Sequence, residues 1–128
     1  SDRTAQEFIK LFPQAPQDEH NLPFEEIKCG LNERTGRGIL YITNTSLYFY
    51  SKMLGETKIQ IPFEQIQSIQ LSPPSVDRNI NIKTSNTEYK FLAFHNDIQS
   101  AFTTIESTWN KINNPVNNEP EPEPEPEP

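Results

Sequence analysis

Cysteine is nearly absent from this sequence, because Cys29 is the only one among 128 residues. A disulfide within the chain and a zinc site built from several cysteines are therefore excluded. Histidine is also scarce: His20 and His95 are the only two, and their positions match neither a metal motif nor a catalytic pair with Cys29. We expect no metal, no cofactor and no enzymatic activity, and we interpret Cys29 as an inert core thiol.

Long hydrophobic runs are missing too. No stretch reaches the roughly 18 apolar residues that a transmembrane helix needs, and the first residues, SDRTAQEF, contain no targeting signal. A single cysteine fits a reducing compartment, so we expect a cytoplasmic location. The chain reads as one domain, and its two ends suggest a piece of a larger protein.

Excess positive charge is absent as well, since the formal net charge is −7. Residues 119–128 consist of five Glu-Pro pairs, which carry five of the 18 acidic side chains. Without them, 11 basic side chains stand against 13 acidic ones, a net charge of −2. The remainder is nearly neutral, so only a local cluster of cations can bind an anionic partner. The Glu-Pro repeat itself predicts an extended tail that repels itself and forms neither helix nor sheet.

Two segments have the apolar spacing of amphipathic helices. In residues 4–12 apolar side chains recur at helical steps, and Pro13 ends the pattern. In residues 98–112 apolar side chains recur at steps of three and four residues over about four helical turns, and Asn96 is the predicted N-cap.

Between these helices the apolar period changes to two, which is the period of β-strands. The three-then-two spacing of Ile66, Ile69 and Leu71 predicts a bulge or a helical turn where the fifth strand starts. Residues 32–38 predict a turn, and Asn44-Thr45 predicts a tight hairpin. The seven predicted strands are residues 24–31, 39–43, 47–51, 57–62, 66–71, 79–83 and 89–94.

Seven antiparallel strands in meander order curl into a sandwich or an open barrel. The last helix must bury its apolar stripe, and an open barrel end or sheet corner offers that place. We therefore predict a mainly β (α+β) fold of the pleckstrin-homology (PH) type: a seven-stranded antiparallel open barrel, a C-terminal amphipathic helix that caps it, and a short N-terminal helix. Residues 1–23 form the N-terminal helix and loop, 24–114 the core, and 115–128 a disordered tail.

Several segments resemble those of a GRAM domain. They are FIKLFPQAPQDE (8–19), FEEIKCGL (24–31), GRGILYITNTSLYFYSKMLG (36–55), KIQIPFEQIQSI (58–69), NINIKTSNTEYKFLAF (79–94) and the closing helix with Trp109. The most specific features are Phe-Pro followed by acids, the Cys-x-Leu strand, the G-x-(L/I)-Y-I-T hairpin, the I-P-F step and the Y-x-F…F pair. The resemblance implies a PH-like module without catalytic activity in a membrane-associated protein, which binds phosphoinositides, phosphatidylserine or protein partners.

Basic residues gather near three predicted turns, which lie together at the open end of a PH-like barrel. We expect the six of them to attract anionic lipid head groups. The plainer alternative is that these side chains are ordinary water-exposed charges at the ends of hairpins. Glu33 and Glu56 favour it, because they lie beside the cations and dilute the positive charge. The six cations are Arg34, Arg37, Lys52, Lys58, Lys83 and Lys90.

Met53 and Leu54 are unusual because they are large apolar side chains in a predicted turn. If they point outward, they form an apolar wedge between Lys52 and Lys58 that suits insertion into a membrane interface. If they fold back, they cover the open end of the barrel. Solvent exposure at these two positions distinguishes the alternatives.

Three tyrosines, Tyr41, Tyr48 and Tyr50, alternate along the central hairpin. A sheet that stacks nucleic-acid bases also has tyrosines, but it needs basic side chains on the same face, and the hairpin has few. We interpret the tyrosines as structural and expect no nucleic-acid partner.

The favoured function is peripheral membrane attachment by weak binding of anionic lipid. The alternative is a protein-interaction module in which a partner meets a strand edge or the groove beside the last helix.

Overall fold

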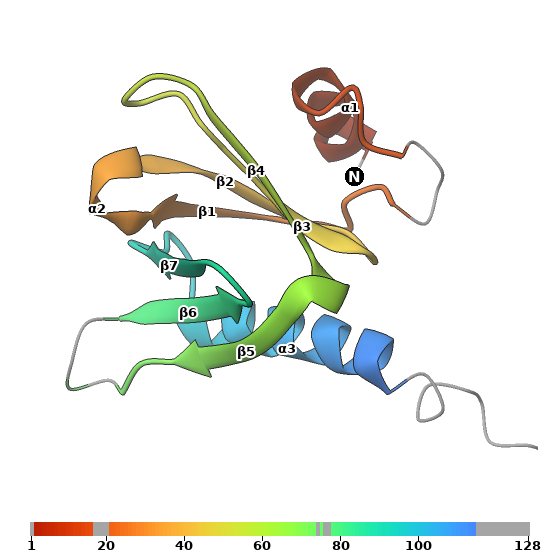
Figure 1. Ribbon diagram of the computed structural model, residues 1–128. Helices are drawn as coiled ribbons and strands as arrows, with labels where there is room; N and C mark the ends of the chain where they lie inside the picture. The colour runs from red at the N-terminus through yellow and green to blue at the C-terminus, as the bar shows by residue number, and fades with distance from the viewer. Residues whose placement is uncertain (1, 17–20, 74, 76–77, 115–128) are drawn as a thin grey trace, which may run out of the picture.

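The computed structural model describes residues 2–16, 21–73, 75 and 78–114, and the predicted Glu-Pro tail lies outside these residues. All seven predicted strands and both predicted helices are present (Figure 1). The elements in chain order are α1 (Asp2–Leu11), β1 (Glu25–Leu31), α2 (Asn32–Thr35), β2 (Arg37–Ile42), β3 (Ser46–Ser51), β4 (Thr57–Pro62), the 3₁₀ helix η1 (Phe63–Gln65), β5 (Ile66–Leu71), β6 (Asn79–Thr84), β7 (Glu88–Leu92) and α3 (Ile98–Asn113).

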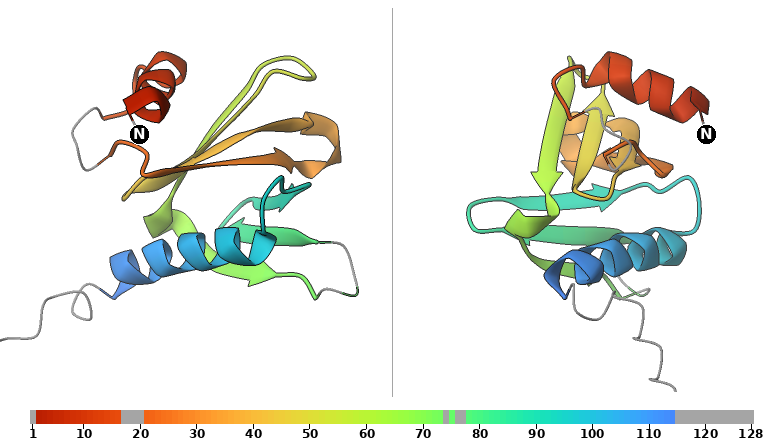
Figure 2. Two further views of the ribbon diagram at one scale, coloured as in Figure 1. Left: turned by 180° about the vertical axis from the view of Figure 1, so that it is seen from behind. Right: turned by 90° about the vertical axis from the view of Figure 1, so that its right-hand side faces the viewer.

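The strands form one antiparallel sheet in the order β4-β3-β2-β1-β7-β6-β5. β4 and β5 are its two edges, so the barrel is not closed, as predicted. The sheet bends, so that β7, β6 and β5 lie below β1 and β2 in the view of Figure 1, and α3 runs beside them (Figures 1 and 2). Close contact between β2 and β3 depends on Gly38, because a Cβ atom there would lie 2.1 Å from the Tyr50 carbonyl oxygen.

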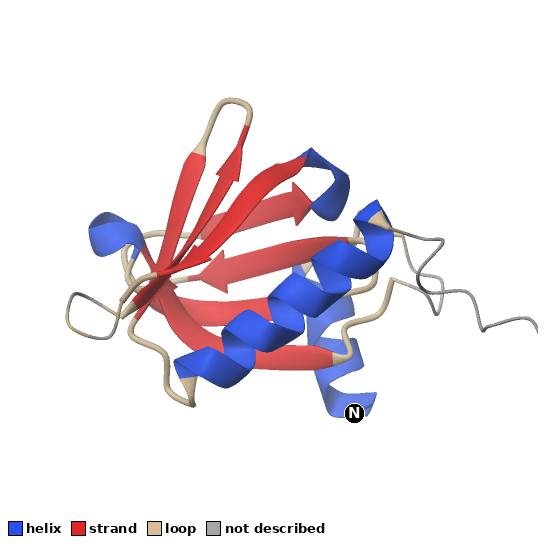
Figure 3. Ribbon diagram, turned by 90° about the horizontal axis from the view of Figure 1, so that it is seen from below, coloured by secondary structure: helices blue, strands red, loops and turns tan. Residues whose placement is uncertain are grey.

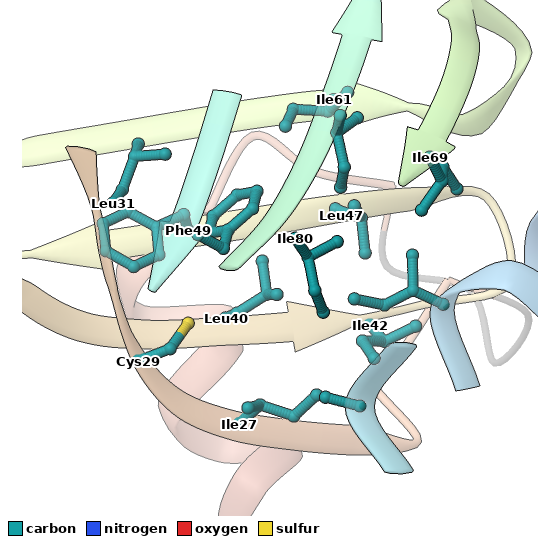
Figure 4. Packing of buried hydrophobic residues seen from close by; sticks show 14 of the residues in the cluster. Ile27, Cys29, Leu31, Leu40, Ile42, Leu47, Phe49, Ile61, Ile69 and Ile80 are labelled. Carbon is teal, nitrogen blue, oxygen red and sulfur yellow. The ribbon is translucent and has the colours of Figure 1, made fainter. Parts of the chain in front are cut away.

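The main core lies inside this bend (Figure 4). The predicted alternation is confirmed, since Ile27, Cys29 and Leu31 of β1 are buried while Lys28 is exposed. Each buried aliphatic or aromatic side chain contributes roughly 1.5–3 kcal/mol to stability. The other strands supply Leu40, Ile42, Leu47, Phe49, Ile61, Ile66, Ile69, Ile80, Ile82 and Phe91.

Helix α3 lies across the strands on the core side (Figure 3). It buries Ala101 and Ile105 in the core, and the Trp109 Nε1–H donates to the Ile66 carbonyl oxygen at 3.3 Å. The predicted N-cap at Asn96 is wrong by one residue. The cap is Asp97, whose carboxylate accepts from the N–H groups of Gln99 and Ser100, each at 3.3 Å.

Helix α1 covers part of the opposite face of the sheet. Its Phe8 ring packs on the Tyr41 and Tyr48 rings with centroid distances of 5.4 and 4.8 Å. Phe12 completes this second cluster, which is separate from the main core. We call this face of β1–β4 the outer face.

Two local predictions need correction or refinement. Residues 32–38 are not only a turn, because residues 32–35 form α2 and β2 already begins at Arg37. The fifth strand has both features that its spacing suggested: η1 precedes β5, and the register with β6 shifts between Ile66 and Ser68.

Candidate functional site

The turn between β3 and β4 exposes the two apolar side chains that the sequence singled out. Met53 is 65% exposed and Leu54 is 67% exposed. Gly55, with φ +84°, allows the chain to reverse there. Neither side chain is packed inside the barrel, so both point outward, and their insertion into a membrane stays a prediction.

Ser51 fixes the base of this turn. Its hydroxyl donates to the Arg37 carbonyl oxygen at 2.8 Å, with the Thr35 carbonyl oxygen at 3.2 Å as an alternative acceptor. The Ser51 oxygen also accepts from the Met53 N–H at 3.4 Å. Met53 lies against Gly36, where a Cβ atom added to the glycine would lie 3.1 Å from the Met53 Cβ. The turn is therefore tied to the end of α2 while its tip stays in solvent.

A hollow of about 340 Å³ lies beside the turn, on the outer face. Two exposed cations, Arg37 and Lys52, border it. Ile39, Tyr50 and Met53 supply most of its remaining wall, which is chiefly hydrocarbon. An apolar wall with a cationic rim suits an amphiphilic anion better than a fully polar one.

The strand register places a row of side chains next to this hollow. Lys28 pairs with Ile39, Ile39 with Tyr50, and Tyr50 with Lys58. These four side chains lie on the outer face, with the half-buried Ile39 and Tyr50 between two exposed lysines. Sequence reasoning missed Lys28, because only the β1–β2 register shows that it shares a face with Lys58.

The remaining predicted cations lie elsewhere. Lys83 on β6 pairs across the strands with Glu88, which is an opposite charge. Lys90 on β7 donates its backbone N–H to the Asn32 Oδ1 at 3.2 Å, so β7 runs beside α2. For Arg34 the structure describes only the backbone, which belongs to α2. The structure thus brings Arg37 and Lys52 together at one hollow, and binding by any of the six stays a prediction.

Further hollows border the sheet, and two of them involve α1 or the exposed Phe24. One lies between the C-terminal end of α1 and edge strand β4, and Phe12, Tyr48, Lys58 and Ile59 are among its lining residues. The other lies beside α3 and is lined by Thr104, Lys111 and Phe24, which is the third large apolar side chain well exposed among the described residues, at 49%.

Cys29 and two of the three hairpin tyrosines, Tyr41 and Tyr48, are buried from solvent. Cys29 is fully buried, and this burial raises the pKa of its thiol to about 12. Tyr41 and Tyr48 lie under α1, which supports the structural interpretation of both. Burial, reinforced by Glu26 and Glu7, raises the pKa of Tyr41 to about 12. His95 is exposed, and His20 lies outside the described residues.

None of the helices in the described part of the chain is long and apolar enough to cross a membrane. Among the same residues, no three histidine, cysteine or carboxylate side chains gather where they could hold a metal ion.

Comparison with solved structures supports the fold. A domain described as the C-terminal domain of an unknown protein from Leishmania infantum matches with a TM-score of 0.69 and 23% identity, over 81% of this chain and 95% of that one. A chain of the 8S snRNP assembly intermediate matches with a TM-score of 0.54 and 18% identity, over 88% and 94% of the two chains. A Vav1 structure with an allosteric inhibitor matches at 0.52 and 9% identity, over 92% of this chain and 35% of that one.

These identities are low enough that the likenesses bear on the fold alone. Among curated proteins, no match was found. The family model of the GRAM domain, by contrast, matches residues 5–114, which is most of the chain. The chain therefore belongs to the GRAM domain family, whose members are generally non-catalytic interaction modules of membrane-associated proteins.

Proposed function

We propose that this GRAM domain attaches its protein to the cytosolic face of a membrane by weak, reversible binding of anionic lipid, either a phosphoinositide or phosphatidylserine. The observation that carries the proposal is the exposure of Met53 and Leu54 beside the cations Arg37 and Lys52. Apolar side chains at the tip enter the interface while the cations meet lipid phosphates.

The expected energies favour a transient contact. One lysine or arginine near an anionic surface contributes about 1 kcal/mol. Full transfer of a methionine or leucine side chain out of water contributes roughly 1.5–3 kcal/mol, and a side chain that enters only the interface gains less. Two apolar residues and a few cations therefore give weak binding, which a second membrane contact in the same protein would strengthen through effective concentration.

Co-sedimentation with liposomes tests this proposal. Phosphatidylcholine vesicles that contain a phosphoinositide or phosphatidylserine should bind the wild-type chain at low salt, and binding should fall as salt screens the charges. Met53→Ser/Leu54→Ser should weaken binding at least about tenfold, which corresponds to about 1.4 kcal/mol. Phe24→Ser, which removes an exposed apolar side chain beside α3, is the matched control and should bind like wild type.

Failure of the wild-type chain to bind any of these vesicles at low salt would disprove the lipid proposal. Equal weakening by Phe24→Ser and by the Met53/Leu54 double variant would contradict the role of the turn.

A second candidate function is protein interaction, which the exposed Phe24 favours. Phe24 borders the hollow beside α3, together with Asn44, Ser107 and Lys111. A partner held there by apolar contact should remain bound at high salt, unlike a partner held by surface charge. Retention of one partner at high salt by the wild type, its loss in Phe24→Ser and no binding to lipid would favour this function over the first.

A further inference from the structure

We infer that the membrane meets this domain along the outer face of β1–β4, so that Lys28 and Lys58 contact lipid head groups together with Arg37 and Lys52, while Lys83 and Lys90 do not. This inference rests on the proposed function. If the domain met the membrane with its open barrel end, all three turns would touch the lipid. In the inferred orientation, which we call the side approach, the outer face of β1–β4 meets the lipid instead.

The first support is the strand register. Lys28, Ile39, Tyr50 and Lys58 are successive cross-strand neighbours on β1, β2, β3 and β4. Neighbouring strands lie about 4.8 Å apart, so this row spans roughly 14 Å across the sheet. Its two lysines are exposed and its two inner residues are half-buried. The row therefore presents positive charge at both ends of a partly apolar strip.

The hollow joins this row to the exposed turn. Ile39 and Tyr50 of the row line the same hollow as Arg37, Lys52 and Met53. The apolar tip and the lysine row thus belong to one continuous surface. Tyr50 suits such a position, because a tyrosine ring is apolar and its hydroxyl is polar, which favours the boundary between lipid and water.

The layers of the molecule separate Lys83 and Lys90 from this surface. The β3–β4 turn and α1 rise on one side of β1 and β2, whereas β6, β7 and α3 lie on the other side (Figures 1 and 2). A membrane that meets the part of the outer face left uncovered by α1 is therefore directed away from the strands that carry Lys83 and Lys90.

Charge complementarity identifies an anionic lipid surface as the occupant. Four exposed cations, Lys28, Arg37, Lys52 and Lys58, border the face. Three acids oppose them: Glu26, which pairs with Tyr41 in the next row, the exposed Glu56 of the turn, and the exposed Glu7 of α1, whose charge acts on Tyr41. The local balance is positive in a chain whose overall charge is negative. Lys83, in contrast, has Glu88 as its cross-strand neighbour.

Two matched double variants test the inference on phosphatidylcholine vesicles that contain either phosphatidylserine or a phosphoinositide. Lys28→Gln/Lys58→Gln and Lys83→Gln/Lys90→Gln each remove two exposed lysines from strands, so they change the net charge equally. The first pair should weaken binding about 20- to 30-fold, from about fivefold for each lysine near the surface. The second pair should change binding less than about threefold. Equal denaturation midpoints confirm that both variants fold.

The outcomes separate this inference from the proposed function. If the wild-type chain binds neither the phosphatidylserine nor the phosphoinositide vesicles, the proposed function itself fails. If the wild type binds but the Lys83/Lys90 pair weakens binding as much as the Lys28/Lys58 pair, or more, lipid binding stands and the side approach is wrong.

A fluorescent label gives an independent readout of orientation. Because Cys29 is fully buried, a cysteine introduced at an exposed site can be labelled selectively. A polarity-sensitive dye on Leu54→Cys should shift to shorter wavelength when vesicles are added. The same dye on Ser85→Cys, in the exposed turn between β6 and β7, should not shift. A shift at position 85 equal to that at position 54 would overturn the side approach.

Discussion

At the residue scale, Cys29 shows how burial changes the chemistry of one side chain. Its thiol lies between Ile27 and Leu31 in the main core, and desolvation raises its pKa from 9.0 to about 12, although the positive charge of Arg37 acts in the opposite direction. A thiolate is the reactive form of cysteine, so the folded protein presents almost none of it at neutral pH. Position in the core, rather than residue type, makes this cysteine inert.

The Cys29 pKa predicts a loss of stability in alkali. Above pH 9 the unfolded thiol ionises while the folded thiol keeps its proton, so the free energy of unfolding falls as the pH rises toward 12. The fall should be about 1 kcal/mol between pH 9 and 10. Denaturant unfolding measures it, and Cys29→Ala should remove most of this slope. An identical slope in the variant would mean that other groups cause the loss.

At the element scale, each helix depends on a few specific contacts. Helix α3 begins where the Asp97 carboxylate accepts two backbone N–H groups, and it is held at β5 by Trp109. Helix α1 is held on the outer face by aromatic packing. These contacts decide where each helix starts and which side of the sheet it covers.

The corrected N-cap gives a prediction at this scale. Asp97→Ala should lower the free energy of unfolding by about 1 kcal/mol, because two N–H groups at the start of α3 lose their acceptor. The neighbouring Asn96→Ala is the control and should change stability by less than about 0.5 kcal/mol. Denaturant midpoints compare the two, and a larger effect at Asn96 would restore the cap predicted from the sequence.

The attachment of α1 to the sheet gives a second prediction at the element scale. Phe8 is 1% exposed and packs on Tyr41, Tyr48 and Phe12, so Phe8→Ala should cost about 3–5 kcal/mol or release α1 from the sheet. Hydrogen exchange of residues 2–11 and denaturant unfolding distinguish these two results. Gln6→Ala, on the exposed side of the same helix, should change neither. Unaltered exchange and stability in Phe8→Ala would mean that α1 does not depend on this packing.

At the scale of the whole molecule, charge is unevenly distributed. The chain has a net charge of −7, but five of its acids lie in residues 119–128 and leave −2 for the rest. Within the rest, the four exposed cations Lys28, Arg37, Lys52 and Lys58 of the outer face stand against three acids, Glu7, Glu26 and Glu56. Long-range repulsion from an anionic membrane therefore comes chiefly from the tail, whereas attraction is local.

Removal of residues 117–128 should consequently strengthen binding to acidic vesicles by severalfold at low salt and less at high salt, as screening predicts. Replacement of the five tail glutamates by glutamine keeps the length of the tail and should have the same effect. Co-sedimentation measures both. Equal affinity of the truncated and intact chains would exclude competition between the tail and the lipid.

The sequence by itself determined the class of fold and the identity of the elements. Apolar periods of two and of three to four residues predicted seven strands and two helices, because burial of one face imposes these periods on strands and helices. The same alternation placed Ile27, Cys29 and Leu31 in the core. The exposed Met53 and Leu54 were recognisable as unusual, since apolar residues seldom occupy turns.

Only the tertiary structure decided how these elements combine into a surface. Periodicity assigns residues to a face of one strand, but it does not give the register between strands, which placed Lys28 in one row with Lys58. Nor does it say which side of the sheet α1 covers, or that Met53 and Leu54 stay in solvent. These features depend on contacts between residues far apart in the chain, and such contacts exist only after the sheet has bent around its core.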